Sequence, residues 1–161
     1  MTQQVSKLTG RDNYFEDFAV GDVYEHARGK TMTEMDNVLI TNLVMNTAQG
    51  HFNEHQMSRS PMGHRIVFGG ITASFIVGLA MQDTGENALA ELTLDRVRFR
   101  MPVFHGDTLY AFTEVLETKD AARPDAGEVL FRHVGLNQDQ KVVFEGERRV
   151  LVKRRSHWGD R

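Results

Sequence analysis

The stretch FGGITASFIVGLAMQDTG, residues 68–85, decides the fold. Two glycines open an almost uninterrupted apolar run, and Asp83, Thr84 and Gly85 close it. A helix that is apolar on nearly all sides must be buried on nearly all sides, so this run predicts one long central helix. Close packing against that helix would be permitted by its small residues, Gly70, Ala73, Ser74 and Gly78.

The residues after this helix alternate between apolar and polar side chains, which is typical of strands. The segments are ALAELTLDRVRFRMPVF (88–104), GDTLYAFTEVLETKD (106–120), GEVLFRHVGLNQD (127–139) and QKVVFEGERRVLVKRR (140–155). Another strand is predicted near residues 23–31, ahead of the helix. The sequence therefore predicts an α+β fold, in which a curved antiparallel sheet wraps around the central helix.

A further helix is predicted after the first strand. Thr33 followed by Asp36 resembles a capping box, and one helical face then carries Met35, Val38, Leu39, Asn42 and Leu43. We expect this helix to end near residues 48–50, where Gly50 supplies a stop signal. A short helix or turn should follow at residues 53–59, before irregular chain through Pro61 and Gly63.

Length and composition predict a single domain over residues 1–161, with loose ends at 1–13 and 156–161. The net charge of −3 gives no general attraction to a polyanion, so no nucleic-acid partner is expected. The chain has no cysteine, which excludes disulfides and thiolate metal sites. Because no apolar run approaches the length of a membrane span, we expect no membrane association and a cytoplasmic location.

The polar stretch NTAQGHFNEH, residues 46–55, could be an active site, a metal site or a loop that contains histidines. The metal interpretation rests on His51 and His55 at positions i and i+4, with Glu54 and His64 nearby. The arrangement is not HExxH, however, and Gly50 indicates that a helix begins only after His51. We therefore expect no metal.

Four segments carry a resemblance to a known family: YFEDFAVGDVYEH, MNTAQGHF, VFGGITASFIVGLAMQD and RFRMPVFHGDTL. Over residues 14–153 the chain resembles the MaoC-like hot-dog-fold enoyl-CoA hydratases and dehydratases. Within that family it is most similar to the mesaconyl-CoA hydratase (methylmalyl-CoA dehydratase) branch. The resemblance implies a hot-dog fold that pairs into a homodimer or a higher oligomer. The family's catalytic Asp and His correspond to Asn46 and His51, and a Gly whose amide binds the thioester oxygen corresponds to Gly69. Phe68 stands where many members have His or Asn.

The resemblance implies reversible hydration of an enoyl-CoA thioester, with coenzyme A as part of the substrate and no other cofactor. His51 would be the acid/base catalyst, because a neutral imidazole can accept a proton at cellular pH. Amides at the start of a helix, at Gly69 and Gly70, would form the oxyanion hole. Asn46 cannot act as a base but could orient the water, or it could simply cap its helix. From the residues alone, His51 could equally be a surface or structural residue, and Gly69–Gly70 could simply be the start of a helix.

The substrate itself is less well defined by the sequence. Phe52 and Phe68 are candidate acyl-binding residues, together with Phe15, Phe18 and Met62. The branch implies a short branched or carboxylated acyl chain such as mesaconyl, for which Arg65 or His64 could supply a cation. Arg98 alternates with Arg96 and Arg100, so it either contacts the coenzyme A phosphates or lies on a solvated sheet face.

Two other functions compete with hydration. A hot-dog thioesterase would bring a carboxylate from the central helix, but residues 71–82 contain no acid and Asp83 lies at the far end. A non-catalytic acyl-CoA-binding protein is the second alternative, since Asn46 replaces the expected Asp.

Overall fold

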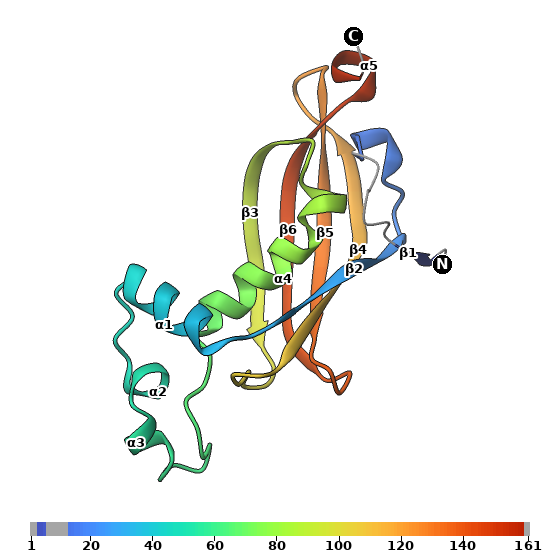
Figure 1. Ribbon diagram of the computed structural model, residues 1–161. Helices are drawn as coiled ribbons and strands as arrows, with labels where there is room; N and C mark the ends of the chain where they lie inside the picture. The colour runs from blue at the N-terminus through green and yellow to red at the C-terminus, as the bar shows by residue number, and fades with distance from the viewer. Residues whose placement is uncertain (1–2, 6–12, 160–161) are drawn as a thin grey trace.

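The computed structural model describes residues 3–5 and 13–159 (Figure 1). Its elements are, in chain order, β1 (Gln3–Val5), the 3-10 helix η1 (Phe15–Asp17), β2 (Val23–Thr31), α1 (Glu34–Leu43), α2 (Gln49–Phe52), α3 (Glu54–Met57), α4 (Gly69–Thr84), β3 (Ala88–Phe99), β4 (Thr108–Asp120), β5 (Ala126–Leu136), β6 (Val142–Lys153) and α5 (Arg155–Trp158). None of these helices is long and apolar enough to cross a membrane.

The strands form one sheet in the order β1-β2-β4-β5-β6-β3. Only β1 and β2 pair in parallel, and every other pair is antiparallel. Helix α4 lies across one face of this sheet and contacts β2, β4, β5 and β6 (Figure 1). The apolar side chains of α4 and the inner face of the sheet form the core, which includes Ile71, Ile76, Phe144 and Leu109, all at 0% exposure. The predicted α+β arrangement is confirmed.

One face of α4 is not covered by this chain, contrary to the prediction that the helix is buried on nearly all sides. Ser74 and Gly78 are exposed, whereas Ile71, Ile76 and Ala80 on the opposite face are fully buried. Strand β3 beside it is an edge strand, because in the described part of the chain only β6 pairs with it. Residues 91–101, which span most of β3, are all exposed. The edge strand and the open helix face together form an uncovered side of the fold.

Helix α1 begins as predicted but is shorter, and the helical face that carries Met35, Leu39 and Leu43 is exposed. The Thr33 hydroxyl accepts a hydrogen bond from the Asp36 amide, and Asp36 accepts one from the Thr33 amide, so the capping box forms. The helix ends at Leu43 rather than near residues 48–50, because Met45 takes a left-handed conformation with φ of 57°. Gly50, the expected stop, lies inside α2.

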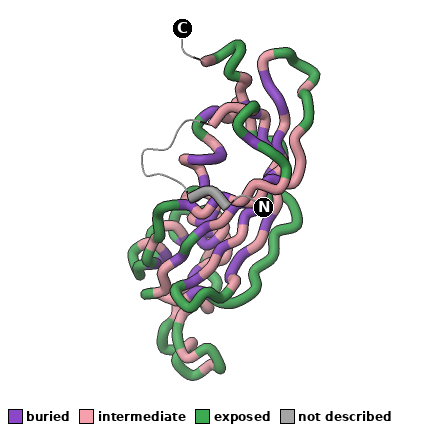
Figure 2. The backbone as a smooth tube through the Cα atoms, turned by 90° about the vertical axis from the view of Figure 1, so that its right-hand side faces the viewer, coloured by how far each residue is buried: buried purple, intermediate pink, exposed green. Residues whose placement is uncertain are grey.

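The chain between α1 and α4 extends beyond one end of the sheet and has no core of its own (Figure 1). No residue from 42 to 66 is buried, and Figure 2 shows this end of the molecule as exposed or intermediate. Parts of the segments predicted to be loose are regular: residues 3–5 form β1, and 155–158 form α5, where the Trp158 indole donates to the Asp125 carbonyl. The rest of those two predictions lies partly outside the described residues.

Candidate active site

His51 lies on α2, and the contacts of its ring define which nitrogen can accept a proton. Nδ1 is 2.9 Å from the carbonyl oxygen of Ile66, which can only accept a hydrogen bond. Nδ1 must therefore carry the proton in the neutral ring, and Nε2 keeps its lone pair. The ring also packs against that of Phe68, with 5.6 Å between the ring centroids. This contact and the hydrogen bond fix the imidazole in one orientation with a basic Nε2.

A groove of about 360 Å³ runs beside His51. Its lining is mostly apolar and comes from α2, from the chain before α4 together with the first turn of α4, and from the end of β3 with the chain after it: His51, Ile66, Val67, Gly69, Thr72, Phe99, Arg100, Met101, Pro102 and Val103. Two backbone contacts hold these segments together. Val67 donates to the Val103 carbonyl, and Ile66 forms an isolated β-bridge with Phe104.

The first turn of α4 presents unpaired backbone donors at this groove. The amides of Ile71 and Thr72 donate to the Phe68 carbonyl, whereas among the described residues no acceptor is found for the amides of Gly69 and Gly70. Gly69 lines the groove, and a Cβ placed on it would lie 3.1 Å from the Phe99 ring. A Cβ on Gly70 would lie 2.5 Å from the Phe68 ring. Only Gly69 of the predicted pair therefore faces the groove, while Gly70 is covered by Phe68.

Asn46 lies just before α2 and is half-buried. The side-chain Oδ1 of Asn46 accepts a hydrogen bond from the Ala48 backbone amide at 3.2 Å. The backbone amide of Asn46 donates to the Thr41 carbonyl near the end of α1. The side chain thus shapes the turn between the two helices, and its Nδ2 is left to donate elsewhere. Asn46 does not itself line the groove next to His51.

The two predicted acyl-binding phenylalanines also lie outside the groove lining. Phe52 ends α2 and is 37% exposed. Phe68 precedes α4, and its ring packs against the His51 ring on one side and against Gly70 on the other. Phe15 and Phe18 pack in a second core cluster with Phe131, and Met62 is 47% exposed. The apolar residues that do line the groove, such as Phe99 and Val103, carry no sequence signal that separates them from ordinary strand residues.

Sequence reasoning missed Asn37, a polar residue in α1 at 0% exposure. Its Nδ2 donates to the His51 carbonyl at 3.2 Å, and its Oδ1 accepts from the Phe68 amide at 3.1 Å. Asn is a poor helix former, so an Asn in mid-helix was the available signal.

Arg98 lines a separate hollow of about 250 Å³ on the outer face of the sheet. Its arginine neighbours there are ion-paired: Arg96 with Glu147, Arg100 with Glu145, and Arg132 with Glu114. No ion pair involves Arg98 in residues 13–159. Arg100 lines both this hollow and the groove of His51, so it connects the two.

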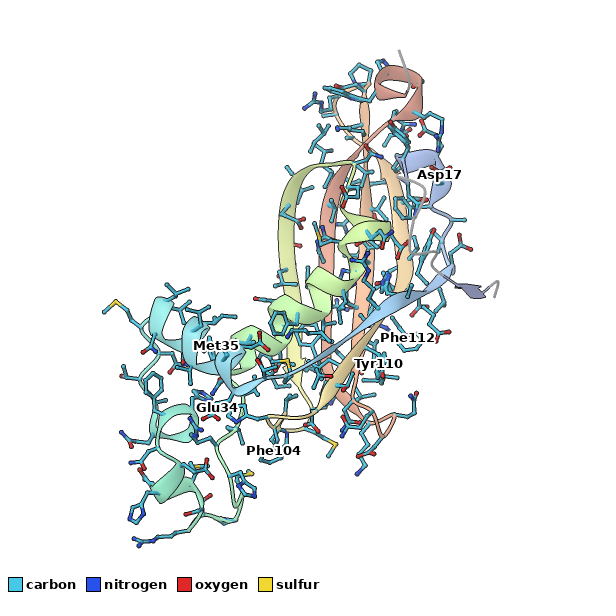
Figure 3. All side chains as sticks on the ribbon, in the orientation of Figure 1. Asp17, Glu34, Met35, Phe104, Tyr110 and Phe112 are labelled. Atoms are coloured by element: carbon cyan, nitrogen blue, oxygen red, sulfur yellow. The ribbon has the colours of Figure 1, made fainter. Side chains whose placement is uncertain are left out.

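Arg65 and His64, the two predicted cations for a substrate carboxylate, contact acidic side chains outside the groove. Arg65 forms ion pairs with Glu34 and with Glu54, and these contacts raise its pKa further. Figure 3 labels Glu34 at the start of α1. His64 is 79% exposed at its side chain and lies against Glu54. No cluster of metal-ligating side chains occurs in the described parts of the chain.

A second buried polar group lies at the far end of α4, against β2, β4 and β5. Asp83 contacts His26 Nδ1 at 2.6 Å, His26 Nε2 lies 2.7 Å from the Thr113 hydroxyl, and that hydroxyl lies 2.7 Å from His133 Nδ1. Burial, followed by the positive charge of Arg148, lowers the pKa of His133 to about 3. Asp83 is the acid at the end of the central helix, and nearly the whole length of that helix separates it from Gly69.

Comparison with known proteins agrees on one family. A family model described as mesaconyl-CoA hydratase matches residues 16–154. The mesaconyl-CoA hydratase of Haloarcula marismortui is 37% identical over 160 residues, which span 88% of this chain and 42% of that protein. The (R)-specific enoyl-CoA hydratase of Rhodospirillum rubrum is 33% identical over 144 residues, which span 89% of this chain and 94% of that protein.

Solved structures give the same result for the fold. A MaoC domain protein from Chloroflexus aurantiacus superposes with a TM-score of 0.85 at 31% identity, over 91% of this chain and 46% of that one. A Mycobacterium tuberculosis protein described as having a double hotdogfold superposes with a TM-score of 0.83 at 21% identity, over 93% of this chain and 47% of that one. The predicted hot-dog fold is confirmed. The chain spans less than half the length of the haloarchaeal relative.

Proposed function

Because the chain belongs to the mesaconyl-CoA hydratase family, we propose that it catalyses the reversible addition of water to the double bond of an enoyl-CoA thioester. The observation that carries this proposal is that His51 and Gly69 line one apolar groove. His51 offers an acceptor nitrogen there, and Gly69 an amide without an internal partner. An acid/base group and an oxyanion donor are what this reaction requires.

In the hydration direction, Nε2 of His51 takes a proton from a water molecule whose oxygen bonds to carbon 3 of the enoyl group. The double-bond electrons move toward the thioester, and negative charge collects on the carbonyl oxygen. The Gly69 amide donates to that oxygen, a contribution typically worth about 3–4 kcal/mol of barrier. His51 then returns the proton to carbon 2, which regenerates the neutral ring and the thioester. The Nδ1 contact with Ile66 stabilises the imidazolium that forms in between.

The proposal keeps for Asn46 the orienting role that the family resemblance implies, although its side chain does not line the groove. Its Oδ1 is occupied by the Ala48 amide, so its Nδ2 is the atom that could donate to the attacking water. A single His can move the proton in both steps, so replacement of the family's Asp by Asn leaves the chemistry complete.

The acyl chain is proposed to be short and branched or carboxylated, as in mesaconyl-CoA. The relatives named mesaconyl-CoA hydratase support this choice, as does the small apolar groove. Arg100 replaces Arg65 and His64 as the candidate cation, since it is the one charged side chain that lines the groove within the described residues. Nε and Nη2 of Arg100 both contact Glu145, and the Arg100 side chain is still 45% exposed.

Arg98 is proposed to bind a phosphate of coenzyme A, because its guanidinium has no carboxylate partner in the described chain and its hollow adjoins the groove at Arg100. Arg98→Gln should raise KM for a coenzyme A ester about 10- to 100-fold, since a hydrogen bond to a charged group is worth about 1.5–3 kcal/mol. Arg96→Gln is the control, because Arg96 is already paired with Glu147.

A second hot-dog fold is proposed to cover the open side formed by β3 and α4. The exposed apolar side chains of β3 and its unpaired edge support this, as does the greater length of the relatives. The partner would be a second copy of this chain or a second domain. Light scattering on the isolated chain tests the first form, for which a dimer mass is expected.

The catalytic proposal is tested with mesaconyl-CoA and crotonyl-CoA. Loss of enoyl absorbance without release of free thiol is expected. Thiol release would instead indicate a thioesterase, and binding without turnover that Asn46→Asp does not restore would indicate a non-catalytic acyl-CoA-binding protein. His51→Gln should lower kcat about 10²–10⁴-fold. The matched control is His55→Gln, which removes an exposed His four residues away. Equal activity of both variants would refute the role of His51.

A further inference from the structure

Helix α1 buries its polar side and exposes its apolar one. Asn37 and Thr41, one turn apart, are both at 0% exposure, whereas Met35, Leu39 and Leu43 are 68%, 52% and 73% exposed. Transfer of an amide or a hydroxyl from water to the protein interior is unfavourable unless its hydrogen bonds are replaced. Ile40 packs against the core from this helix, and the hydrogen bonds of Asn37 to residues outside the helix are its buried polar contacts. The orientation of α1 therefore depends on Asn37 as well as on Ile40.

The hydrogen bonds of Asn37 connect the two halves of the candidate active site. Its Nδ2 donates to the carbonyl of His51, the acid/base residue, at 3.2 Å. Its Oδ1 accepts from the amide of Phe68, the residue immediately before Gly69, at 3.1 Å. Thr41 contributes only to the helix itself, since its hydroxyl donates to the Asn37 and Val38 carbonyls.

The His51 segment needs such an anchor. No residue from 42 to 66 is buried, so apolar packing does not hold α2 in place. The other hydrogen bonds between α2 and the chain before α4 are the bond from the Ile66 amide to the Gly50 carbonyl and the contact of His51 Nδ1 with the Ile66 carbonyl. Both end at Ile66, two residues short of the N-cap residue Phe68, whose ring packs against the His51 ring. Within the described residues, Asn37 alone joins the backbone of His51 by hydrogen bonds to the peptide that begins the helix.

We propose that Asn37 is a positioning residue, which fixes the distance and angle between His51 Nε2 and the Gly69 amide. This inference rests on the proposed hydratase function. Catalytic groups must be held within about 0.5 Å of their productive geometry, which a segment without buried residues of its own does not achieve unless a buried group supports it. The side-chain amide of Asn37 also favours the Nδ1-protonated tautomer of His51, because it holds the His51 backbone where Nδ1 reaches the Ile66 carbonyl.

The test compares Asn37→Leu, which removes both hydrogen bonds at similar volume, with Thr41→Val. Thr41 is the matched control because it lies on the same buried face and its loss removes a buried hydrogen bond without touching His51 or Phe68. We expect Asn37→Leu to lower kcat at least tenfold with KM within threefold, and Thr41→Val to change kcat less than threefold. Asn37→Asp keeps the acceptor for the Phe68 amide and loses the donor to His51, so an intermediate kcat is expected.

A second readout does not depend on turnover. Nitrogen chemical shifts of the His51 ring should report the Nδ1-protonated tautomer in the wild type and in Thr41→Val, and a mixture in Asn37→Leu and Asn37→Asp. If the wild type lacks hydratase activity, the proposed function fails, and the ring tautomer still decides the role of Asn37. If Asn37→Leu does not fold, Asn37→Asp decides. A folded Asn37 variant with wild-type kcat, or with an unchanged ring tautomer, overturns the inference.

Discussion

Removal of the His133 imidazole should make the free energy of unfolding less dependent on pH below neutrality. His133 is fully buried in β5, where its Nδ1 is 2.7 Å from the Thr113 hydroxyl and its Nε2 has no partner. Burial lowers its pKa from 6.5 to about 3. In the unfolded chain the ring takes up a proton below pH 6.5, whereas in the folded protein it stays neutral down to about pH 3.

The sign and size follow from that difference. At pH 8 the ring is neutral in both states and its titration costs no stability, whereas between pH 6.5 and about 3 only the unfolded chain binds the proton, so the free energy of unfolding falls as the pH falls through that range. Each unit below 6.5 costs about 1.4 kcal/mol, so the wild type should lose about 2 kcal/mol from this residue between pH 8 and pH 5. That is a large part of the 5–15 kcal/mol by which domains are typically stable, here used as a rough scale.

The measurement is denaturant unfolding of the wild type and His133→Gln at several pH values between 8 and 5. The variant loses the Thr113 contact and is less stable throughout, so the pH slopes are compared rather than the absolute values. The other titrating groups are common to both proteins and cancel. His55→Gln, which removes an exposed His, should keep the wild-type slope. If the slopes of the wild type and His133→Gln coincide, His133 is not buried in its neutral form and the reasoning is refuted.

Three substitutions of glycine by alanine should distinguish effects on the stability of the fold from effects on catalysis. Gly135→Ala places a Cβ 2.6 Å from the Ile76 side chain in the core, so it should lower the free energy of unfolding by about 1–3 kcal/mol. Gly78→Ala meets nothing within 4 Å inside α4 and should raise it by about 0.5–1 kcal/mol; both are measured by denaturant unfolding. Gly69→Ala brings a Cβ 3.1 Å from the half-exposed Phe99 ring, which can yield, so kcat for hydration should fall at least tenfold while the melting temperature changes little.

The longer regular elements could be predicted because each has a local cause, whereas β1, α2 and α5 were missed. The apolar run of α4, the alternation in β3 to β6 and the capping box at Thr33 are all readable within a few residues. His51 and Gly69 were identified from the family resemblance, and the structure places both along one groove; their roles stay predictions. The groove depends on contacts between distant segments, which no local pattern encodes.

The errors have physical reasons as well. Asn37 was missed because its hydrogen bonds to His51 and Phe68 involve residues 14 and 31 positions away, while the apolar face of the same helix is exposed. Arg65 looked available for a substrate, but Glu34 and Glu54 neutralise it from two different helices. Both outcomes depend on tertiary pairing.

The position of Phe99 links assembly to substrate shape. This residue ends the edge strand β3, and its ring lies against both Gly69 and Phe144 while lining the groove. A strand that pairs with β3 would lie beside the same ring, which bounds the groove proposed to hold the acyl chain, and would restrict its positions. Thermodynamic reciprocity then requires that a ligand which selects one position of Phe99 alters the affinity of the edge strand for its partner by the same factor. In this fold the strength of association and the preferred acyl group would change together under selection.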